Sequence, residues 1–350
     1  MQLTPFIKSI MDDFLSKRII NLSYNSILNI LLYELSKIPG AYRIKNYGKI
    51  VNYYCIGFAP SGQGKDYTIN SCEELLLKDF RKHFNNKIFE AREKLKKGME
   101  QEALEKYPYD LKGNNDKNLA KRNEWISNQK EKIREVASEI SIKSSASGLY
   151  TDAATFSLYD FGSLNVECTE LSSFMKSSKP EELRVFQHLL ELYEGKIKPS
   201  SYKGESNKIY VENCHTNMML LSDPSMLLNK IMKNNFLESL QTGFARRCNF
   251  TYQPISILKP VDFKVDFETE EFCLSNLTPR INEITNILEN SDRNITFTPE
   301  AQKLLNDYNC KCVKKHNNIL RYTHHVILNE LKDRHYKAKA RLYYSLYRTS

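Results

Sequence analysis

The segment from Ala59 to Asp66 constrains the fold of this chain more than any other feature. It reads Ala-Pro-Ser-Gly-Gln-Gly-Lys-Asp and follows an apolar run over residues 50–58 that is typical of a buried strand. Glycines such as Gly62 and Gly64 let backbone N–H groups close around a phosphate, and Lys65 adds a positive charge there. The pattern therefore predicts a phosphate-binding loop, or P-loop, between this strand and a helix that begins near Lys65.

Two positions depart from the usual P-loop pattern. Ala59 stands where the first glycine usually is, and Asp66 stands where a serine or threonine hydroxyl normally meets Mg²⁺. The second departure matters because a carboxylate binds a metal well but repels a phosphate. The residues that we expect to line the nucleotide site are Pro60, Ser61, Gly62, Gln63, Gly64, Lys65, Asp66 and Tyr67.

Composition adds only broad limits. The chain has 350 residues, of which 41% are apolar, and its net charge of +9 fits a partner with phosphates such as nucleic acid, although many basic proteins bind none. Its eight cysteines are scattered, several of them in apolar runs, as free buried thiols are. No signal peptide is visible, and no run reaches the ~18 apolar residues that a membrane helix needs. We therefore expect a protein of the reducing cytoplasm (a bacterial host's cytoplasm if it is viral) with no membrane partner.

The order of patterns predicts an α/β fold, a P-loop NTPase core with a mostly parallel sheet and helical regions at both ends. We expect an N-terminal helical region over residues 1–46, the core over 47–275 with a helical insertion at about 74–140, and a C-terminal helical region over 276–350. The insertion mixes Lys, Arg and Glu, which favours a solvated helical hairpin over a DNA-facing arm. Within the core, strands are expected at 163–168, 208–214 and 247–252, helices at 180–193 and 224–240, and an exposed strand or hairpin at 261–275. Helices are also expected to begin at Thr278 and Thr298, each an N-cap threonine followed by proline in the first turn.

An acidic segment over residues 162–171 is the second element of the expected site. P-loop ATPases place an acid at the tip of a strand beside the loop, where it polarises the attacking water, and Glu170 suits that role. Thr169 stands where the metal-side aspartate is expected, so we hypothesise that Asp66 and Thr169 have exchanged roles in the Mg²⁺ shell, with Glu170 also near the metal. The alternative is an ordinary core strand with surface glutamates.

Two further elements follow in the chain. The polar end of the run over 208–217 suits a sensor of the γ-phosphate, for which Asn217 or Thr216 is a candidate and His215 a competitor. Arg246 and Arg247 follow a glycine and suit a charge clamp on the transferring phosphate, supplied within the subunit or to a neighbouring one. The alternative for the run over 208–217 is an ordinary polar strand end that enters a loop. The alternative for the two arginines is structural or solvated ion pairing.

Two patterns near the end of the chain are weaker. Cys310, Cys312 and His316 lack a fourth ligand at the usual spacing, which argues against a zinc site. Lysines, arginines and tyrosines mix over residues 332–348, where they suit stacking on single-stranded nucleic acid or packing against another domain.

The order of these motifs resembles the P-loop ATPases of phage and plasmid replication modules, helicase or primase-associated proteins with a RecA/AAA+-like core. The resemblance covers roughly residues 25–345 and is carried by the segments 59–66, 147–153 (expected as a turn), 165–171, 189–195 and 243–247. It implies ATP and Mg²⁺ as cofactors and hydrolysis coupled to unwinding of, or translocation on, DNA, with single-stranded DNA the expected partner. It also implies a homo-oligomer, often a hexameric ring.

The resemblance implies a role for each matching position. Lys65 would bind the β- and γ-phosphates, Glu170 would be the catalytic acid, and Arg246 or Arg247 would be the charge clamp. Two alternatives stay open. One is a nucleotide-binding assembly or loader protein with weak hydrolysis, and the other is a P-loop kinase that acts on a small molecule.

Overall fold

The computed structural model describes most of the first 304 residues and a few isolated positions as far as residue 314. The described ranges are 4–17, 20–46, 48–109, 115–130, 139–141, 146–176, 180–197, 211–241, 243–253 and 273–304. Three of the sequence predictions lie outside them in whole or in large part: the possible zinc ligands Cys312 and His316, the basic, tyrosine-rich stretch over 332–348, and the strand or hairpin at 261–275. Of the last, only residues 273–275 are described, and they lie in the 3₁₀ turn η4 (Cys273–Leu277) rather than in a strand.

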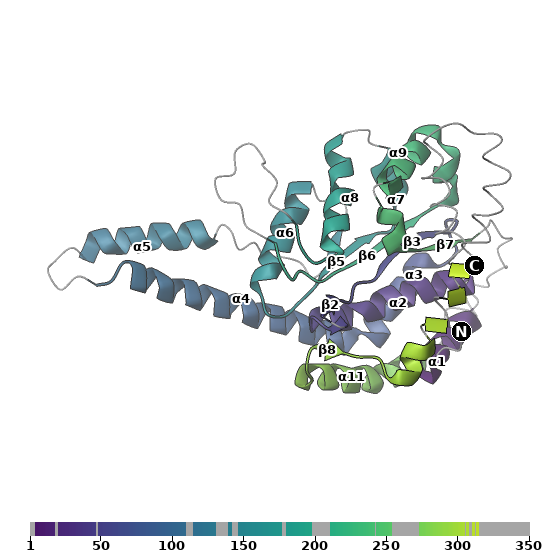
Figure 1. The fold of residues 1–350 in the computed structure, drawn as a ribbon, viewed down its shortest axis with the longest axis horizontal. Coiled ribbons are helices and arrows are strands. Elements are labelled where there is room, and N and C mark those ends of the chain that lie inside the picture. Colours follow the sequence, from purple (N-terminus) through teal and green to yellow (C-terminus); the bar gives the residue numbers. More distant parts are fainter. Residues whose placement is uncertain are drawn as a thin grey trace, which may run out of the picture.

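A parallel sheet forms the centre of the described part of the molecule (Figure 1). Across the sheet its five strands are β4 (Glu139–Ser141), β5 (Leu164–Cys168), β6 (Thr216–Ser222), β3 (Tyr54–Phe58) and β7 (Cys248–Tyr252). Every neighbouring pair is parallel. The predicted α/β class is therefore confirmed, and the strand before the glycine segment lies between β6 and β7.

Helices cover both faces of the sheet. Successive side chains of a strand point to opposite faces, and the apolar side chains of these strands supply a hydrophobic surface on each. Tyr54 and Ile56 of β3 belong to one hydrophobic cluster, whereas Cys55 between them belongs to the other. The first cluster is closed by helices α6 (Ala146–Leu158), α7 (Leu171–Met175), α8 (Pro180–Leu192) and α9 (Lys230–Gln241). The second is closed by α1 (Pro5–Ser16), α2 (Tyr24–Ala41), α3 (Lys65–Ser71), the π-helix η1 (Cys72–Leu76) and α11 (Thr278–Asn290). Figure 1 shows these two groups above and below the strands.

The terminal helices pack on the same core as the sheet. Ile10 of α1, Ile27 of α2 and Ile281 of α11 are buried in one cluster with Met219 of β6. A small second sheet joins β1 (Lys45–Asn46) to β2 (Lys49–Ile50) and β8 (Asn294–Ile295). The helices α1, α2 and α11 thus cover one face of the sheet.

The predicted helical insertion is a pair of long helices. Figure 1 shows α4 (Lys78–Lys106) and α5 (Asn115–Lys130) projecting away from the sheet. Two cation–π contacts join the pair near its tip: Arg122 lies 4.1 Å from the ring centre of Tyr109, and Lys106 lies 5.7 Å from that of Trp125.

Several boundaries confirm the local sequence signals, and two do not. The helix expected at Thr278 begins there, but Thr278 is not its N-cap, which is Leu277, and the Thr278 hydroxyl donates to the Leu75 carbonyl instead (3.0 Å). The Thr298 hydroxyl accepts a hydrogen bond from the Ala301 N–H (3.2 Å) as an N-cap does. The expected turn over 147–153 is wrong, since these residues lie within α6. Of the strand expected at 208–214 the structure describes residues 211–214, where only Val211 forms an isolated bridge, to Ile197, and β6 begins at Thr216.

Candidate functional site

The glycine loop, residues Ala59–Gly64, joins the carboxyl end of β3 to the first residue of α3. Gly62 and Gly64 have φ of +75° and +86°, which are left-handed conformations that favour glycine. Gly64 is the N-cap residue of α3, and its carbonyl accepts the Thr68 N–H at 2.9 Å. The helix therefore begins at Lys65, as the sequence predicts, and its first-turn N–H groups lie at the end of the loop.

Lys65 lies half-buried within this loop. Its Nζ donates to the carbonyl of Ala59 at 2.8 Å, so the lysine folds back across the segment that precedes it. Burial lowers the pKa of Lys65, and the carboxylates of Asp223, Glu170 and Asp66 oppose that shift, in this order of strength. Three acidic side chains from three different segments thus act on one lysine.

Asp223 is the acid with the strongest effect on Lys65, and sequence reasoning missed it. It follows the last residue of β6, and its Oδ2 accepts the Ser61 N–H at 2.9 Å. Its Oδ1 accepts the Ser225 N–H at 2.8 Å, as the N-cap of the 3₁₀ turn η2 (Pro224–Leu228). These hydrogen bonds, first among them that from Ser225, lower the pKa of Asp223. The available signal was Asp223-Pro224 after an apolar run, a typical helix start.

Glu170 lies at the carboxyl end of β5, as predicted, but not on a strand beside the loop. Because β6 separates β5 from β3, the acidic strand is the second neighbour of the loop strand. Glu170 is exposed, and its Oε2 lies 3.4 Å from the hydroxyl of Ser172. Thr169 is half-buried, whereas Asp66 is exposed on the first turn of α3. The exchange of metal roles between Asp66 and Thr169 stays a prediction.

Gln63 has a structural role in the loop. Its side chain is 2% exposed, and its Oε1 accepts Nε2 of Gln253 at 3.0 Å. Gln253 follows β7 and also donates its own N–H to Phe58 of β3 at 2.7 Å. The Gln63 carbonyl accepts the Asn21 N–H at 3.1 Å. The loop is therefore held on one side by the end of β7 and on the other by Asp223.

The other loop residues divide between surface and core. Ser61 and Gly62 are exposed, whereas Pro60 is buried. Tyr67 is half-buried and packs against the hydrophobic cluster on the α3 side of the sheet.

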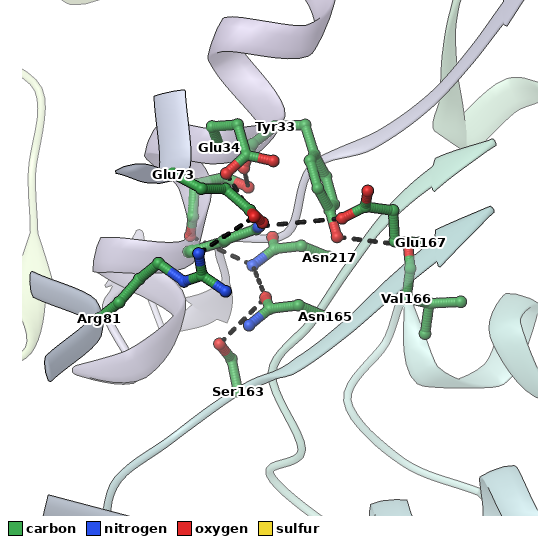
Figure 2. Close-up of polar contacts among 11 residues, drawn as sticks. Tyr33, Glu34, Glu73, Arg81, Ser163, Asn165, Val166, Glu167 and Asn217 are labelled. Atoms are coloured by element: carbon green, nitrogen blue, oxygen red, sulfur yellow. Dashed lines mark hydrogen bonds and ion pairs between the residues drawn. The ribbon is translucent and has the colours of Figure 1, made fainter. Parts of the chain in front are cut away.

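Asn217 does not lie near the loop, so the prediction of a polar sensor at a strand end is wrong in its geometry. Asn217 and Thr216 begin β6 at the amino edge of the sheet, whereas the loop lies at the carboxyl edge. Asn217 is fully buried and donates to Asn165 (3.0 Å) and to the Ser36 carbonyl (3.1 Å), and Figure 2 shows it beside Asn165. Its side chain ties α2 to two strands.

His215 precedes β6 at this same edge, so it does not compete for the sensor role at the loop. Burial lowers its pKa to about 3.

Arg246 and Arg247 are likewise at the amino edge. They end the turn η3 (Phe244–Arg247), and β7 begins directly after them in register with the start of β3. A strand rises roughly 3.3 Å per residue, so β3 holds them on the order of 15 Å from the loop of the same subunit. Arg247 pairs with Glu194 at 2.9 Å and lies 5.4 Å from the ring centre of Tyr193, whereas Arg246 is exposed. The structure contradicts a clamp within one subunit.

An acidic cluster of one buried and two half-buried glutamates lies on the α2 side of the sheet (Figure 2). Glu34, Glu73 and Glu167 bring carboxylate oxygens within 4.8 Å of one another. Lys37 Nζ lies among them, at 2.8 Å from Glu34, 3.1 Å from Glu73 and 3.9 Å from Glu167. An ammonium group therefore already lies among these carboxylates, which argues for a structural charge network and against a metal centre.

The donor set around Lys65 is compatible with the Mg²⁺–ATP that the sequence predicts. Asp66, Glu170 and Asp223 offer carboxylate oxygens, the ligands that Mg²⁺ prefers, and the loop offers N–H groups at a helix start.

Comparisons with known proteins add no identification. We found no significant match to a protein-family model, to a curated protein or to a solved structure. In the part of the chain that the structure describes, every helix is too short or too polar to cross a membrane.

Proposed function

We propose that this chain is an ATP-dependent DNA-replication motor of helicase type, which binds Mg²⁺–ATP at the glycine loop and couples its hydrolysis to movement on single-stranded DNA. The observation that carries the proposal is the loop itself. Two left-handed glycines and Lys65 join the carboxyl end of an inner strand to a helix, and acids from β5 and β6 act on that lysine. Ligands of parallel α/β sheets bind at this edge.

The residues at this edge suit distinct roles. Lys65 would contact the β- and γ-phosphates, and Glu170, exposed after β5, would polarise the attacking water. Asp66 and Thr169 would share the Mg²⁺ shell with Glu170. When bound, Mg²⁺ supplies charge neutralisation on the phosphates. A nucleotide-bound structure in which Asp66 points away from the metal and its waters would contradict the exchange of roles with Thr169.

The position of the arginines supports an oligomeric motor. Arg246 is exposed at the amino edge of the sheet, and the loop lies at the opposite edge. A head-to-tail contact between subunits would bring the two edges together, as in a ring. Arg246 would then act as the charge clamp on the neighbouring subunit's nucleotide.

The same geometry favours a second candidate, a nucleotide-binding assembly or loader protein with weak hydrolysis. Neither predicted arginine lies at the loop of its own subunit, so an isolated subunit lacks the predicted clamp. In such a protein ATP would hold subunits together with little turnover.

The experiment that separates the candidates is the ATPase rate with and without single-stranded DNA, alongside a mass measurement with ATP. For a motor, we expect DNA to stimulate turnover, ATP to raise the mass, and Lys65→Ala to lower the rate roughly hundredfold or more because a charge on the phosphates is lost. Lys233→Ala, which removes an exposed lysine on α9, is the matched control and should leave the rate unchanged.

Three results would change this assignment. An ATP-dependent rise in mass with slow turnover that ignores DNA would favour the assembly protein. A small species that is indifferent to DNA and phosphorylates a small molecule would favour a kinase. Absence of ATP binding would contradict both ATP-binding readings at once.

A further inference from the structure

Asp223 links the glycine loop to the end of β6. Its two carboxylate oxygens accept backbone N–H groups from opposite sides, Ser61 in the loop at 2.9 Å and Ser225 in η2 at 2.8 Å. A second hydrogen bond joins the same two segments, from the Ala59 N–H to the Ser222 carbonyl at 3.0 Å. The orientation of this carboxylate is therefore fixed by backbone groups.

This fixed carboxylate stands in the electrostatic surroundings of Lys65. The lysine is half-buried, and Asp223, Glu170 and Asp66 all act on it. One positive group thus stands in the field of three negative ones at the place where a polyphosphate would bind. Like charges repel more strongly where the site is partly removed from water, so these carboxylates oppose a free nucleotide anion.

We infer that Asp223 is a positioning residue that makes nucleotide binding at the glycine loop depend on a divalent cation. It fixes Ser61 through the backbone, and it adds the third carboxylate that a bare polyphosphate must overcome. A nucleotide that arrives with Mg²⁺ brings the positive charge that offsets these carboxylates. This inference rests on the proposed nucleotide site, but it concerns which form of the nucleotide that site accepts.

The test is a titration of the full chain with a fluorescent ATP analogue, in excess Mg²⁺ and in EDTA. We expect wild type to bind at least about tenfold more tightly with Mg²⁺, and Asp223→Asn to bind the metal-free analogue about three- to tenfold more tightly than wild type does. Asp116→Asn, the same change on the distant helix α5, is the matched control and should behave as wild type.

The sign of the change separates this role from a purely structural one. If Asp223 only held the loop in shape, the Asn variant would bind more weakly, or equally, in EDTA, and that result would overturn the inference.

A second measurement needs no variant. In EDTA, added monovalent salt should tighten binding to wild type by screening the repulsion. Weakening by salt would show that attraction to Lys65 dominates and would overturn the inference.

The two proposals fail in different ways. Saturable binding to wild type that is equal in Mg²⁺ and in EDTA would keep the nucleotide site and overturn only the role of Asp223. Absence of saturable binding in Mg²⁺ would overturn the nucleotide site, and the inference with it.

Discussion

Glu34 shows how strongly the surroundings of one side chain alter its chemistry. It is fully buried on α2, and desolvation raises its pKa to about 8 despite the opposing effect of Lys37. Glu167 and Glu73 raise the pKa further, and Arg81 pairs with Glu73 at 3.0 Å. With Glu34 protonated at neutral pH, two carboxylates remain for Lys37 and Arg81, so the charges balance. From the sequence alone, Glu34 and Lys37 are ordinary helix-surface residues.

The contribution of Glu34 to the stability of the protein should therefore fall as the pH rises from about 4.5 to about 8. The folded-state pKa of Glu34 lies above the unfolded value of 4.5, so its contribution is complete below about pH 4.5 and is lost as the pH rises to about 8. The slope is at most about 1.4 kcal/mol per pH unit. Urea unfolding of wild type and Glu34→Gln should show the free energy of unfolding of wild type falling relative to the variant across this range.

The free energy of unfolding of wild type must be compared with that of the variant at each pH, because buried histidines titrate in the same pH range and change stability in the opposite direction. Burial lowers the pKa of His188 and that of His215, so their effect is to raise stability with pH. Glu238→Gln, on an exposed glutamate, is the control and should parallel wild type. Parallel profiles for Glu34→Gln and wild type would show that Glu34 is ionised in the folded protein.

At the scale of elements, the joint between β3 and α3 depends on backbone conformation. Gly62 at φ +75° and Gly64 at φ +86° turn the chain so that α3 can begin at Lys65. Local residues were enough to predict the strand before the loop and the helix after it. They also predicted the helix starts at Thr278 and Thr298, because each of these features depends on residues adjacent in the chain.

Gly62→Ala should destabilise the protein through this conformation alone. A Cβ at position 62 would meet nothing within 4 Å, so no clash contributes and the left-handed φ should cost roughly 1–2 kcal/mol. Gly98→Ala is the matched control, since Gly98 is exposed in α4 with equally open space. It should stabilise by roughly 0.5–1 kcal/mol because alanine favours helix. Urea unfolding measures both, and a Gly62→Ala variant as stable as wild type would contradict the argument.

At the scale of the whole molecule, the two edges of the sheet have different chemistry. The carboxyl edge holds the glycine loop with Glu170 and Asp223, whereas the amino edge holds the buried Asn217 network and the exposed Arg246. Asn217 was assigned to the wrong edge in sequence analysis, because the strand predicted at 208–214 ends before β6 begins at Thr216.

Mixed subunits test whether the two edges meet between copies. Lys65→Ala and Arg246→Ala should each have low ATPase activity alone. If Arg246 completes a neighbour's site, a mixture should be more active than the average of the two, because some sites pair an intact loop with an intact arginine. Mixing either variant with itself is the control. A mixture that equals the average would contradict action between subunits.

The sequence by itself determined the local features: an α/β alternation, a glycine loop between strand and helix, Lys65 at the helix start and a long helical insertion. These follow from periodicity, caps and glycine conformations within a few residues of each other. Only the tertiary structure decided that β6 lies between β3 and β5, that Asp223 rather than Asn217 faces the loop, and that Glu34 is buried. The physical reason is that strand order and helix burial depend on which apolar surfaces pack together between segments far apart in the chain. The local sequence pattern of a strand or helix is nearly the same whichever neighbour it packs against.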